Sequence, residues 1–330
     1  MMRSEARWDV STFGETMLRL SPPHYARLEE ATSLEVRIGG AESNVAVALC
    51  RLGMRACWWS RLPNTPLGRR IENEIRRWGV DTSGVIWDSS PKARAGLYFL
   101  DFGVSPRATE VYYDRASSAA SALGPEDVEE ERIARSRLLH VTGITPALSP
   151  RCAAAVRYAI EVAKKVGTRV SLDTNYRARL WSVEAARATI EPLLPQVDLL
   201  IVPHEEAQLL FAMAEEKAQM ARALHTRYGV VNVVVTCGGE GAYAFSPSGE
   251  HFAAPYPIAH VVDRVGAGDA FDAGVIFGYL QQNLPLGLEM GMAMAALKHT
   301  IPGDLLLCTF EEIEVVRTAH GQASTPSIRR

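Results

Sequence analysis

The sequence predicts an α/β fold in which a mostly parallel central sheet is covered by helices on both faces. Short apolar runs alternate with helical patterns along nearly the whole chain, which is typical of parallel βαβ units. Four segments break this rhythm, because polar and apolar residues alternate in them with a period of two. We expect these segments to form a small β-sheet lid, contributed by about residues 17–38 and 95–114.

The individual elements follow from the spacing of apolar residues. No repeat or Pro/Gly/Ser linker divides the 330 residues, so they predict a single domain. The lid strands, expected to be half exposed and antiparallel, lie at 17–20, 34–38, 97–100 and 110–113. Strands of the central sheet are expected at 8–13, 57–59, 138–142, 169–173, 199–202 and 231–236. Helices are expected at 41–52, 68–78, 151–166, 183–194 and, after a β-rich run from 261, at 267 to about 280.

Composition excludes several classes of protein. The formal net charge is −3 and no basic cluster exceeds an arginine pair, which disfavours a nucleic-acid partner. No apolar stretch approaches the roughly 20 residues that a membrane span needs, and the first eight residues lack the apolar core of a signal peptide. Five cysteines without a C-x-x-C pair argue against a disulfide scaffold or a structural zinc site. We therefore expect a cytoplasmic protein without a membrane partner.

The run GAGD at 266–269 is the most informative segment. Glycines at a helix start let backbone N–H groups converge on an anion, and the helix dipole adds positive potential there. Asp269 beside such an anion hole could accept a hydroxyl proton during phosphoryl transfer, or it could simply cap the helix. The Walker A, protein-kinase and G-x-G-x-x-G motifs are absent, so neither those kinases nor a dinucleotide dehydrogenase is favoured.

Two glycine-rich runs carry a family resemblance. DRVGAGD at 263–269 and GGAESNVA at 39–46 resemble the two signatures of the ribokinase-like (PfkB) carbohydrate kinases. The resemblance implies a ribokinase-like three-layer α/β/α domain and an ATP- and Mg²⁺-dependent kinase. Other matching segments resemble the ketodeoxygluconate branch of that family, which implies phosphorylation of the terminal hydroxyl of 2-keto-3-deoxygluconate. These segments are GLY at 96–98, YDRA at 113–116, GITPAL at 143–148, DTNYR at 173–177 and KHTIPGD at 298–304.

The resemblance also implies a role for each matching site residue. Asp269 would be the general base, and Gly266, Ala267 and Gly268 would form the anion hole for the transferring phosphoryl group. Glu206 would lie in the outer shell of Mg²⁺, although Pro203 stands where the family often has Asn. The residues implied to face the sugar acid are Gly40, Asn44, Tyr98, Tyr113, Arg115, Ile144, Arg177 and Asp304. Those implied to contact ATP are Thr236, Gly238 and Gly241, with Arg264 near the phosphates.

Arg115 and Arg177 favour a substrate that carries a carboxylate, because a guanidinium fork matches that group. They could instead form ordinary ion pairs, and Tyr98 and Tyr113 could simply pack the lid. Asp272 is expected to interact mainly with the helix dipole. The alternatives are a fructokinase or another sugar or nucleoside kinase on the same scaffold, and a non-catalytic sugar-acid-binding protein. Lid strands with an exposed apolar face also predict a homodimer.

Overall fold

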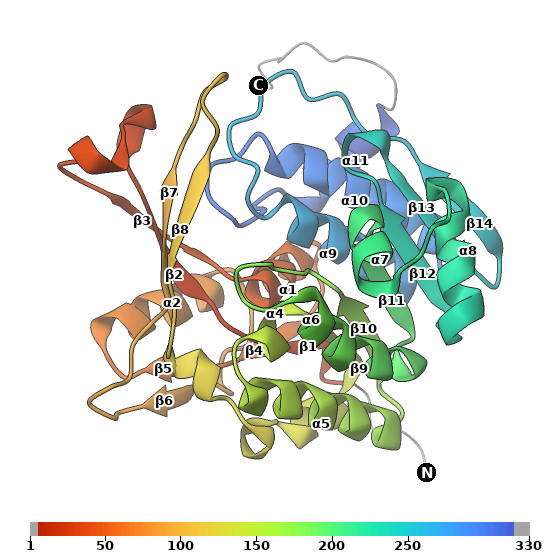
Figure 1. Ribbon diagram of the computed structural model, residues 1–330, viewed down its shortest axis with the longest axis horizontal. Helices are drawn as coiled ribbons and strands as arrows, with labels where there is room; N and C mark the ends of the chain where they lie inside the picture. Colours follow the sequence, from red (N-terminus) through yellow and green to blue (C-terminus); the bar gives the residue numbers. More distant parts are fainter. Residues whose placement is uncertain (1–5, 320–330) are drawn as a thin grey trace.

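The computed structural model describes residues 6–319. Its central sheet has eight strands in the order β14-β13-β12-β11-β10-β9-β1-β4 (Figure 1). The six strands from β12 to β4 are parallel, and the β13–β14 hairpin adds two antiparallel strands at one edge. The bounds are Trp8–Phe13 (β1), Ala56–Trp59 (β4), Ser136–Thr142 (β9), Arg169–Asp173 (β10), Leu199–Pro203 (β11), Asn232–Thr236 (β12), Ala242–Ser246 (β13) and Gly249–Ala253 (β14).

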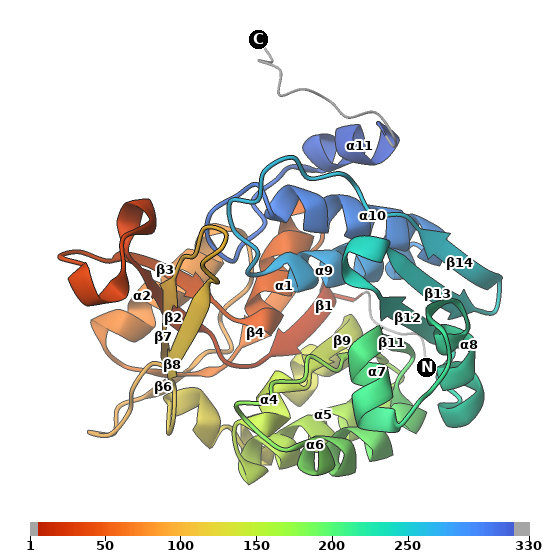
Figure 2. The same ribbon diagram turned by 45° about the horizontal axis from the view of Figure 1, so that its top comes forward.

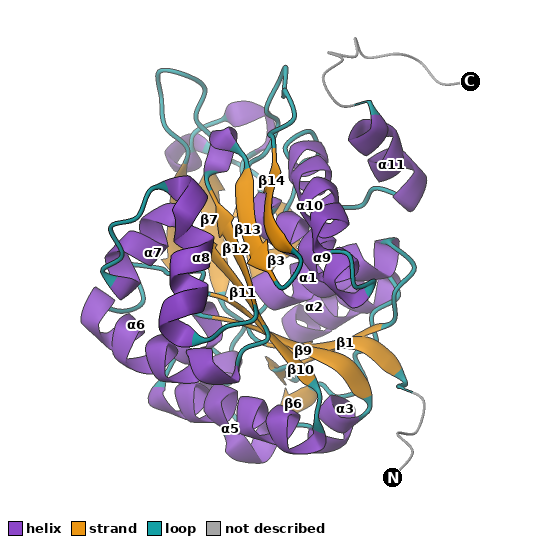
Figure 3. Cartoon of the chain, turned by 90° about the vertical axis from the view of Figure 1, so that its right-hand side faces the viewer, coloured by secondary structure: helices purple, strands orange, loops and turns teal. Residues whose placement is uncertain are grey.

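Helices cover both faces of this sheet, which confirms the expected three layers (Figure 3). Adjacent strand residues point to opposite layers: Leu138 packs in the cluster formed with α1, α9 and α10, and Leu139 packs with α5 to α8. The first layer consists of α1 (Ala41–Arg51), α9 (Ala267–Leu280) and α10 (Leu284–Lys298). The second consists of α5 (Pro150–Val166), α6 (Val183–Ile190), α7 (His204–Phe211) and α8 (Lys217–Tyr228). Smaller elements are α2 (Pro66–Arg77), α3 (Glu130–Ala134), α4 (Ile144–Ala147), α11 (Phe310–Thr318), β5 (Arg61–Pro63) and β6 (Ile86–Asp88).

The lid is a separate four-stranded sheet in the order β3-β2-β7-β8, and Figure 2 shows it grouped at one side of the central sheet beside α2. Its outer pairs are antiparallel as expected, but the central pair β2–β7 is parallel, so that part of the prediction was wrong. Along the sequence, β3, α1, β4, β5, α2 and β6 separate β2 from β7. A long connection of this kind is what two parallel neighbours require. The bounds are Met17–Ser21 (β2), Glu35–Gly39 (β3), Leu97–Asp101 (β7) and Glu110–Asp114 (β8).

Two other expectations differ from the structure. The run from 261 to 265 is not a strand: the amides of Val262 and Asp263 donate to the carbonyl of His299, and the amide of Val265 donates to the Asp263 carboxylate. The helix expected at 183–194 ends at Ile190 and continues as a 3₁₀ segment, because prolines follow within it. No helix among residues 6–319 has the length and apolar character that crossing a membrane requires.

The packing of α9 against α10 depends on glycine. A Cβ on Gly274 would lie 2.4 Å from the backbone nitrogen of Gly291, and a Cβ on Gly278 would lie 2.3 Å from the Cα of Gly287. The two helices therefore touch backbone to backbone, which leaves α9 no freedom to shift along its partner.

Gly274→Ala should lower the free energy of unfolding by about 1–3 kcal/mol, because the added methyl overpacks a contact that the α10 backbone cannot relieve. The control is Gly239→Ala, since no atom lies within 4 Å of a Cβ there and its φ is not positive. Thermal unfolding of both variants measures the difference, and equal Tm values would contradict the close contact.

Candidate active site

A cavity of about 1040 Å³ opens at the carboxyl ends of the parallel strands. Ligands of open α/β sheets bind at this edge, and the lid covers one side of it. All seventeen residues that the sequence assigned to the site line this cavity. Residues that follow β1, β9, β10, β11 and β12 contribute to it, namely Glu15, Ile144, Arg177, Glu206 and Gly238.

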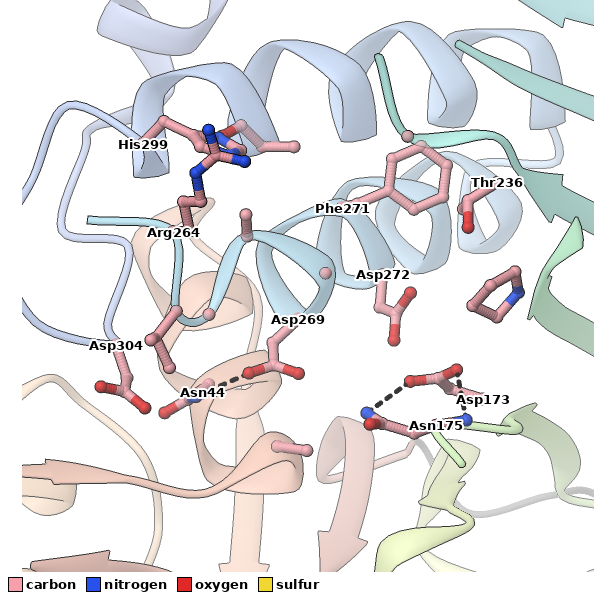
Figure 4. A pocket seen from close by; sticks show the side chains of 18 of the residues that line it. Asn44, Asp173, Asn175, Thr236, Arg264, Asp269, Phe271, Asp272, His299 and Asp304 are labelled. Atoms are coloured by element: carbon pink, nitrogen blue, oxygen red, sulfur yellow. Dashed lines mark hydrogen bonds between the residues drawn. The ribbon is translucent and has the colours of Figure 1, made fainter. Parts of the chain in front are cut away.

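The N-terminus of α9 points into the cavity (Figure 4). Gly266 precedes the helix with φ of +86°, and a Cβ there would lie 2.0 Å from the carbonyl oxygen of Asp304. A side chain at Gly268 would meet no atom within 4 Å, so the space in front of the first turn is open. No side chain caps the helix. The amide of Ala267 donates to the carbonyl of Arg264 at a long 3.4 Å, and the amides of Gly268 and Asp269 point toward the open space, where an anion could accept from them.

Asp269 lies in that first turn and does not cap it. Its Oδ2 accepts a hydrogen bond of 2.6 Å from Nδ2 of Asn44, a buried residue of α1 (Figure 4). Burial raises the pKa of Asp269 to about 6, although the Asn44 hydrogen bond and the charge of Arg177 oppose the rise. A carboxylate with this pKa is ionised at neutral pH and can still take up a proton.

Asp272 faces Asp173 across the cavity (Figure 4). Both side chains are nearly inaccessible to solvent. Asp173 accepts hydrogen bonds from the amide (3.1 Å) and Nδ2 (2.8 Å) of Asn175. Burial raises the pKa of Asp173 to about 7, and burial together with the charge of Asp173 raises the pKa of Asp272.

The lid supplies two tyrosines with different surroundings. Tyr98 is buried, and its hydroxyl donates to Oδ2 of Asp304 at 2.6 Å. Tyr113 is exposed, and its ring centroid lies 5.9 Å from that of Tyr98. Only Tyr98 therefore combines packing with a polar contact inside the protein.

The two arginines of the site also differ. Nε of Arg115 donates to Oε2 of Glu15 at 2.7 Å, and its Nη2 donates to the same oxygen. The Glu15 side chain is fully buried, so the ion-pair alternative holds for Arg115. Arg177 is exposed to the cavity, and its guanidinium makes no hydrogen bond or ion pair with any other residue in 6–319. Arg177 is thus the guanidinium available to an anion.

The opposite end of the cavity is largely apolar. Thr236, Gly238 and Gly241 line it where β12 passes into the β13 hairpin, and exposed Arg264 also lines the cavity. Sequence reasoning missed most of this wall, because a loop without periodicity gives no signal. The additional lining residues there are Pro255, Tyr256, Pro257, Ile258, Met292, Ala295, Ala296 and His299.

Glu206 lies between the two ends. Its Oε2 accepts hydrogen bonds from Oγ1 of Thr174 (2.6 Å) and from the amide of Tyr176 (3.0 Å). Across the described part of the chain, no group of three or more His, Cys, Asp or Glu side chains could hold a metal ion by itself. Mg²⁺ commonly takes one or two carboxylates and completes its shell with water and phosphate oxygens. Glu206 alone, or the buried Asp173–Asp272 pair, would supply the one or two carboxylates that such an ion needs, and a cation would favour the charged form of the pair, which burial disfavours.

Glu15, Asp173 and Asn175 also belong to the site, although the sequence analysis gave them no role. Asp173 and Asn175 lie within the run DTNYR at 173–177, so their place at the end of a strand could have identified them. Glu15 follows the first strand in the same way.

Comparisons with known proteins agree with this geometry. A profile of the pfkB family carbohydrate kinases matches residues 8–305. A 2-dehydro-3-deoxygalactonokinase of Haloferax volcanii is 40% identical over 310 residues, which cover 93% of this chain and 96% of the relative. A 2-dehydro-3-deoxygluconokinase of Bacillus subtilis is 34% identical over 299 residues, covering 90% and 91%. The crystal structure of a 2-dehydro-3-deoxygluconokinase from Thermotoga maritima superposes with a TM-score of 0.90 at 36% identity, covering 96% of this chain and all of that one.

The Asp173–Asp272 pair predicts a pH-dependent stability. Because both pKa values are raised in the folded protein, it binds more protons than the unfolded chain between about pH 4 and 7. Stability conferred by this pair should therefore fall as pH rises through that window. Asp272→Asn removes the repulsion and should raise stability at pH 8 by at least about 1 kcal/mol.

Thermal unfolding of wild type and Asp272→Asn from pH 5 to 8 measures this effect. Glu161→Gln on α5 is the control, since it removes one exposed carboxylate far from the pair. If Asp272→Asn is less stable than wild type at pH 8, the two carboxyls do not repel each other.

Proposed function

Because the chain belongs to the pfkB family of carbohydrate kinases, we propose that it transfers a phosphoryl group from ATP to the terminal hydroxyl of 2-keto-3-deoxygluconate. The observation that carries the proposal is the placement of Asp269 beside the open N-terminus of α9, in one cavity with the unpaired Arg177. The relatives named above support a 2-keto-3-deoxy sugar acid. Their names include both the gluconate and the galactonate form, so the galactonate form is the second candidate.

In the proposed reaction, Asp269 accepts the proton of the sugar hydroxyl. The hydroxyl oxygen then forms a bond to the γ-phosphorus of ATP while the bond to ADP breaks. The amides around Gly266, Ala267 and Gly268 would stabilise the charge on the transferring group, because they are already oriented when the phosphate arrives. The open space at Gly268 supports this role, since a phosphate needs close approach to the backbone there.

ATP would extend from this point along Thr236, Gly238 and Gly241, with its base against the apolar wall and its phosphates near Arg264. Mg²⁺ would sit near Glu206, Asp173 and Asp272. When bound, it would neutralise part of the phosphate charge. Pro203 lacks the side-chain amide of the Asn that the family often has at this position. The arrangement does not need that amide, because hydrogen bonds from Thr174 and Tyr176 orient Glu206.

The sugar acid would occupy the lid end. Arg177 would hold its carboxylate, while Arg115, oriented by Glu15, would present its remaining N–H groups to oxygens of the substrate. A neutral sugar would leave Arg177 without a partner, which disfavours a fructokinase. The other residues proposed to face the substrate are Gly40, Asn44, Tyr98, Tyr113, Ile144 and Asp304.

Asp269→Asn should lower kcat by about 100-fold or more, because the amide cannot take the hydroxyl proton. ATP binding, followed by calorimetry, should stay near the wild-type value. The wild-type rate should also fall as pH drops below about 6, where the carboxylate becomes protonated. Near-wild-type turnover in this variant would exclude Asp269 as the base.

Arg177→Ala should raise KM for the keto-deoxy acid by about 10- to 150-fold, since one charge-assisted contact is lost. Any slow turnover of fructose should hardly change, so fructose serves as an internal control for damage to the fold. The assay uses wild type and variant with both keto-deoxy acids, fructose and a nucleoside. If wild type prefers fructose or the nucleoside, the sugar-acid proposal is wrong.

We also propose that the protein is cytoplasmic, because its reaction consumes ATP. We propose further that it forms a homodimer, because the lid has an apolar outer face. Leu20 lies beside Val36 and Phe99 across the strands, and Phe99 lies beside Tyr112, so the four side chains form one row. Val36 is 44% and Tyr112 is 48% exposed, which makes the row available to a second copy. Light scattering should find a dimer that Tyr112→Asp converts to a monomer. A wild-type monomer at micromolar concentration would contradict the proposal.

A further inference from the structure

Arg19 is a lid residue that the preceding roles do not include. It lies on β2, yet its side chain is only 1% exposed. Nη2 donates to Oδ2 of Asp263 at 2.5 Å, and Nη1 donates to Oδ1 of Asp304 at 2.7 Å. The guanidinium also lies 5.3 Å from the ring centroid of Phe102. A single side chain thus joins the lid to two carboxylates from the last quarter of the chain.

Asp304 is the substrate-side end of this bridge. Its Oδ1 is bonded to Arg19, and its Oδ2 accepts from the hydroxyl of Tyr98. A Cβ on Gly39 would lie 2.1 Å from Oδ2, so the backbone of β3 encloses the same carboxylate. Asp304 lines the cavity, and its carboxylate is therefore fixed from the lid side at the place where the sugar would bind.

Asp263 is the phosphate-side end. Its Oδ1 accepts from the amide of Val265 (3.1 Å), and its Oδ2 accepts from the amide of Gly303 (2.9 Å). Asp263 thereby shapes the turn that leads directly into Gly266 and α9. Gly266 packs against the backbone of Asp304, so the loop before α9 and the loop that carries Asp304 also touch each other directly.

The charges of this network balance within the protein. Two basic side chains, Arg19 and Lys298, and two acidic ones, Asp263 and Asp304, are buried together. Nζ of Lys298 donates to the carbonyls of Asp263 (3.4 Å) and Ile301 (2.9 Å). Burying four charged groups carries a desolvation cost that a hydrophobic cluster of similar volume would avoid. What such a network does supply is one defined arrangement of the groups that it connects.

We propose that Arg19 is a positioning residue that fixes the loop carrying Asp304 relative to the loop carrying Gly266–Gly268. The inference rests on the proposed function, because it assigns the first loop to the sugar and the second to the phosphoryl group. Phosphoryl transfer needs the attacking oxygen close to and in line with phosphorus, and a misplacement of about 1 Å can cost roughly 100-fold in rate. A guanidinium suits this role because its planar fork reaches two carboxylates at once.

Arg19→Gln and Arg19→Lys test the proposal, with Arg37→Gln and Arg37→Lys as matched controls. Arg37 lies directly opposite Arg19 on β3, but its side chain is 40% exposed, and its one ion pair within residues 6–319 is with Glu35. Its side chain lies near Gly303 without a hydrogen bond to Asp263 or Asp304. Arg19→Gln should lower kcat by about 100-fold, with KM for ATP within about threefold of wild type. The kcat of Arg19→Lys should lie between those of wild type and Arg19→Gln, because an ammonium keeps the charge but cannot reach two carboxylates with a planar fork. Both Arg37 variants should behave as wild type.

The pH profile separates positioning from mere stabilisation. Burial raises the pKa of Asp304, and the charge of Arg19 opposes that rise. In Arg19→Gln the Asp304 carboxyl should therefore take up a proton at higher pH, and because it would contact the sugar, its protonation should add to that of Asp269 and move the acid limb of kcat to higher pH. Arg19→Lys should keep the acid limb close to its wild-type pH, because the ammonium keeps the positive charge. If Arg19→Gln lowers Tm but keeps the wild-type kcat and pH profile at a temperature where it is folded, the proposal is overturned.

A measurement on wild type decides the case if the variants do not fold. The sugar acid alone should slow hydrogen exchange at the Val265 amide, and a non-hydrolysable ATP analogue alone should slow exchange at Gly303, because Arg19 holds both loops together. Unchanged exchange at both amides would overturn the proposal. Kinetics use whichever sugar wild type phosphorylates best, so a wrong sugar assignment and a wrong role for Arg19 give different results.

Discussion

The N-terminus of α9 must stand open at the edge of the sheet, and most of the site depends on this constraint. Free amides at a helix start are tolerable only where solvent or an anion can reach them. Two contacts hold the helix there: the backbone approach of Gly274 to α10 and the packing of Gly266 against Asp304. Both require glycine, because the available distances leave no room for a Cβ. The open helix end is therefore a product of helix packing as much as of the local turn.

Around that helix end, the partners of each carboxyl determine its protonation. Asp304 and Asp263 both accept hydrogen bonds from Arg19, and burial raises the pKa of Asp304 while the charge of Arg19 opposes that rise. Burial raises the pKa of both Asp173 and Asp272, and the charge of Asp173 adds to the rise for Asp272. Within the described residues, the side chain of Asp269 has one hydrogen bond, from Asn44. Burial raises its pKa to about 6, so it is suited to gain and lose a proton.

The lid presents two different faces, formed by alternate residues of the same strands. Residues paired across it share a face, so Arg19, Tyr98 and Tyr113 lie on one side, while Leu20, Phe99 and Tyr112 lie on the other. The first face reaches the cavity and the network of Asp304, and the second carries the apolar row. A shift of one residue in register would exchange the two faces.

The sequence by itself indicated a parallel α/β sheet and the lid segments, because periodicity is a local property of the chain, and its resemblance to the family's motifs pointed to seventeen of the residues that line the cavity. It also identified the helix start at Gly266, since glycine and the following apolar run mark it. Only the tertiary structure decided that Arg115 pairs with Glu15 while Arg177 stays unpaired, and that Asp272 meets Asp173 instead of solvent. The bridge from Arg19 to Asp263 and Asp304 spans 244 and 285 positions of the chain. Partners so far apart leave no trace in local spacing, because their proximity arises from packing of the whole domain.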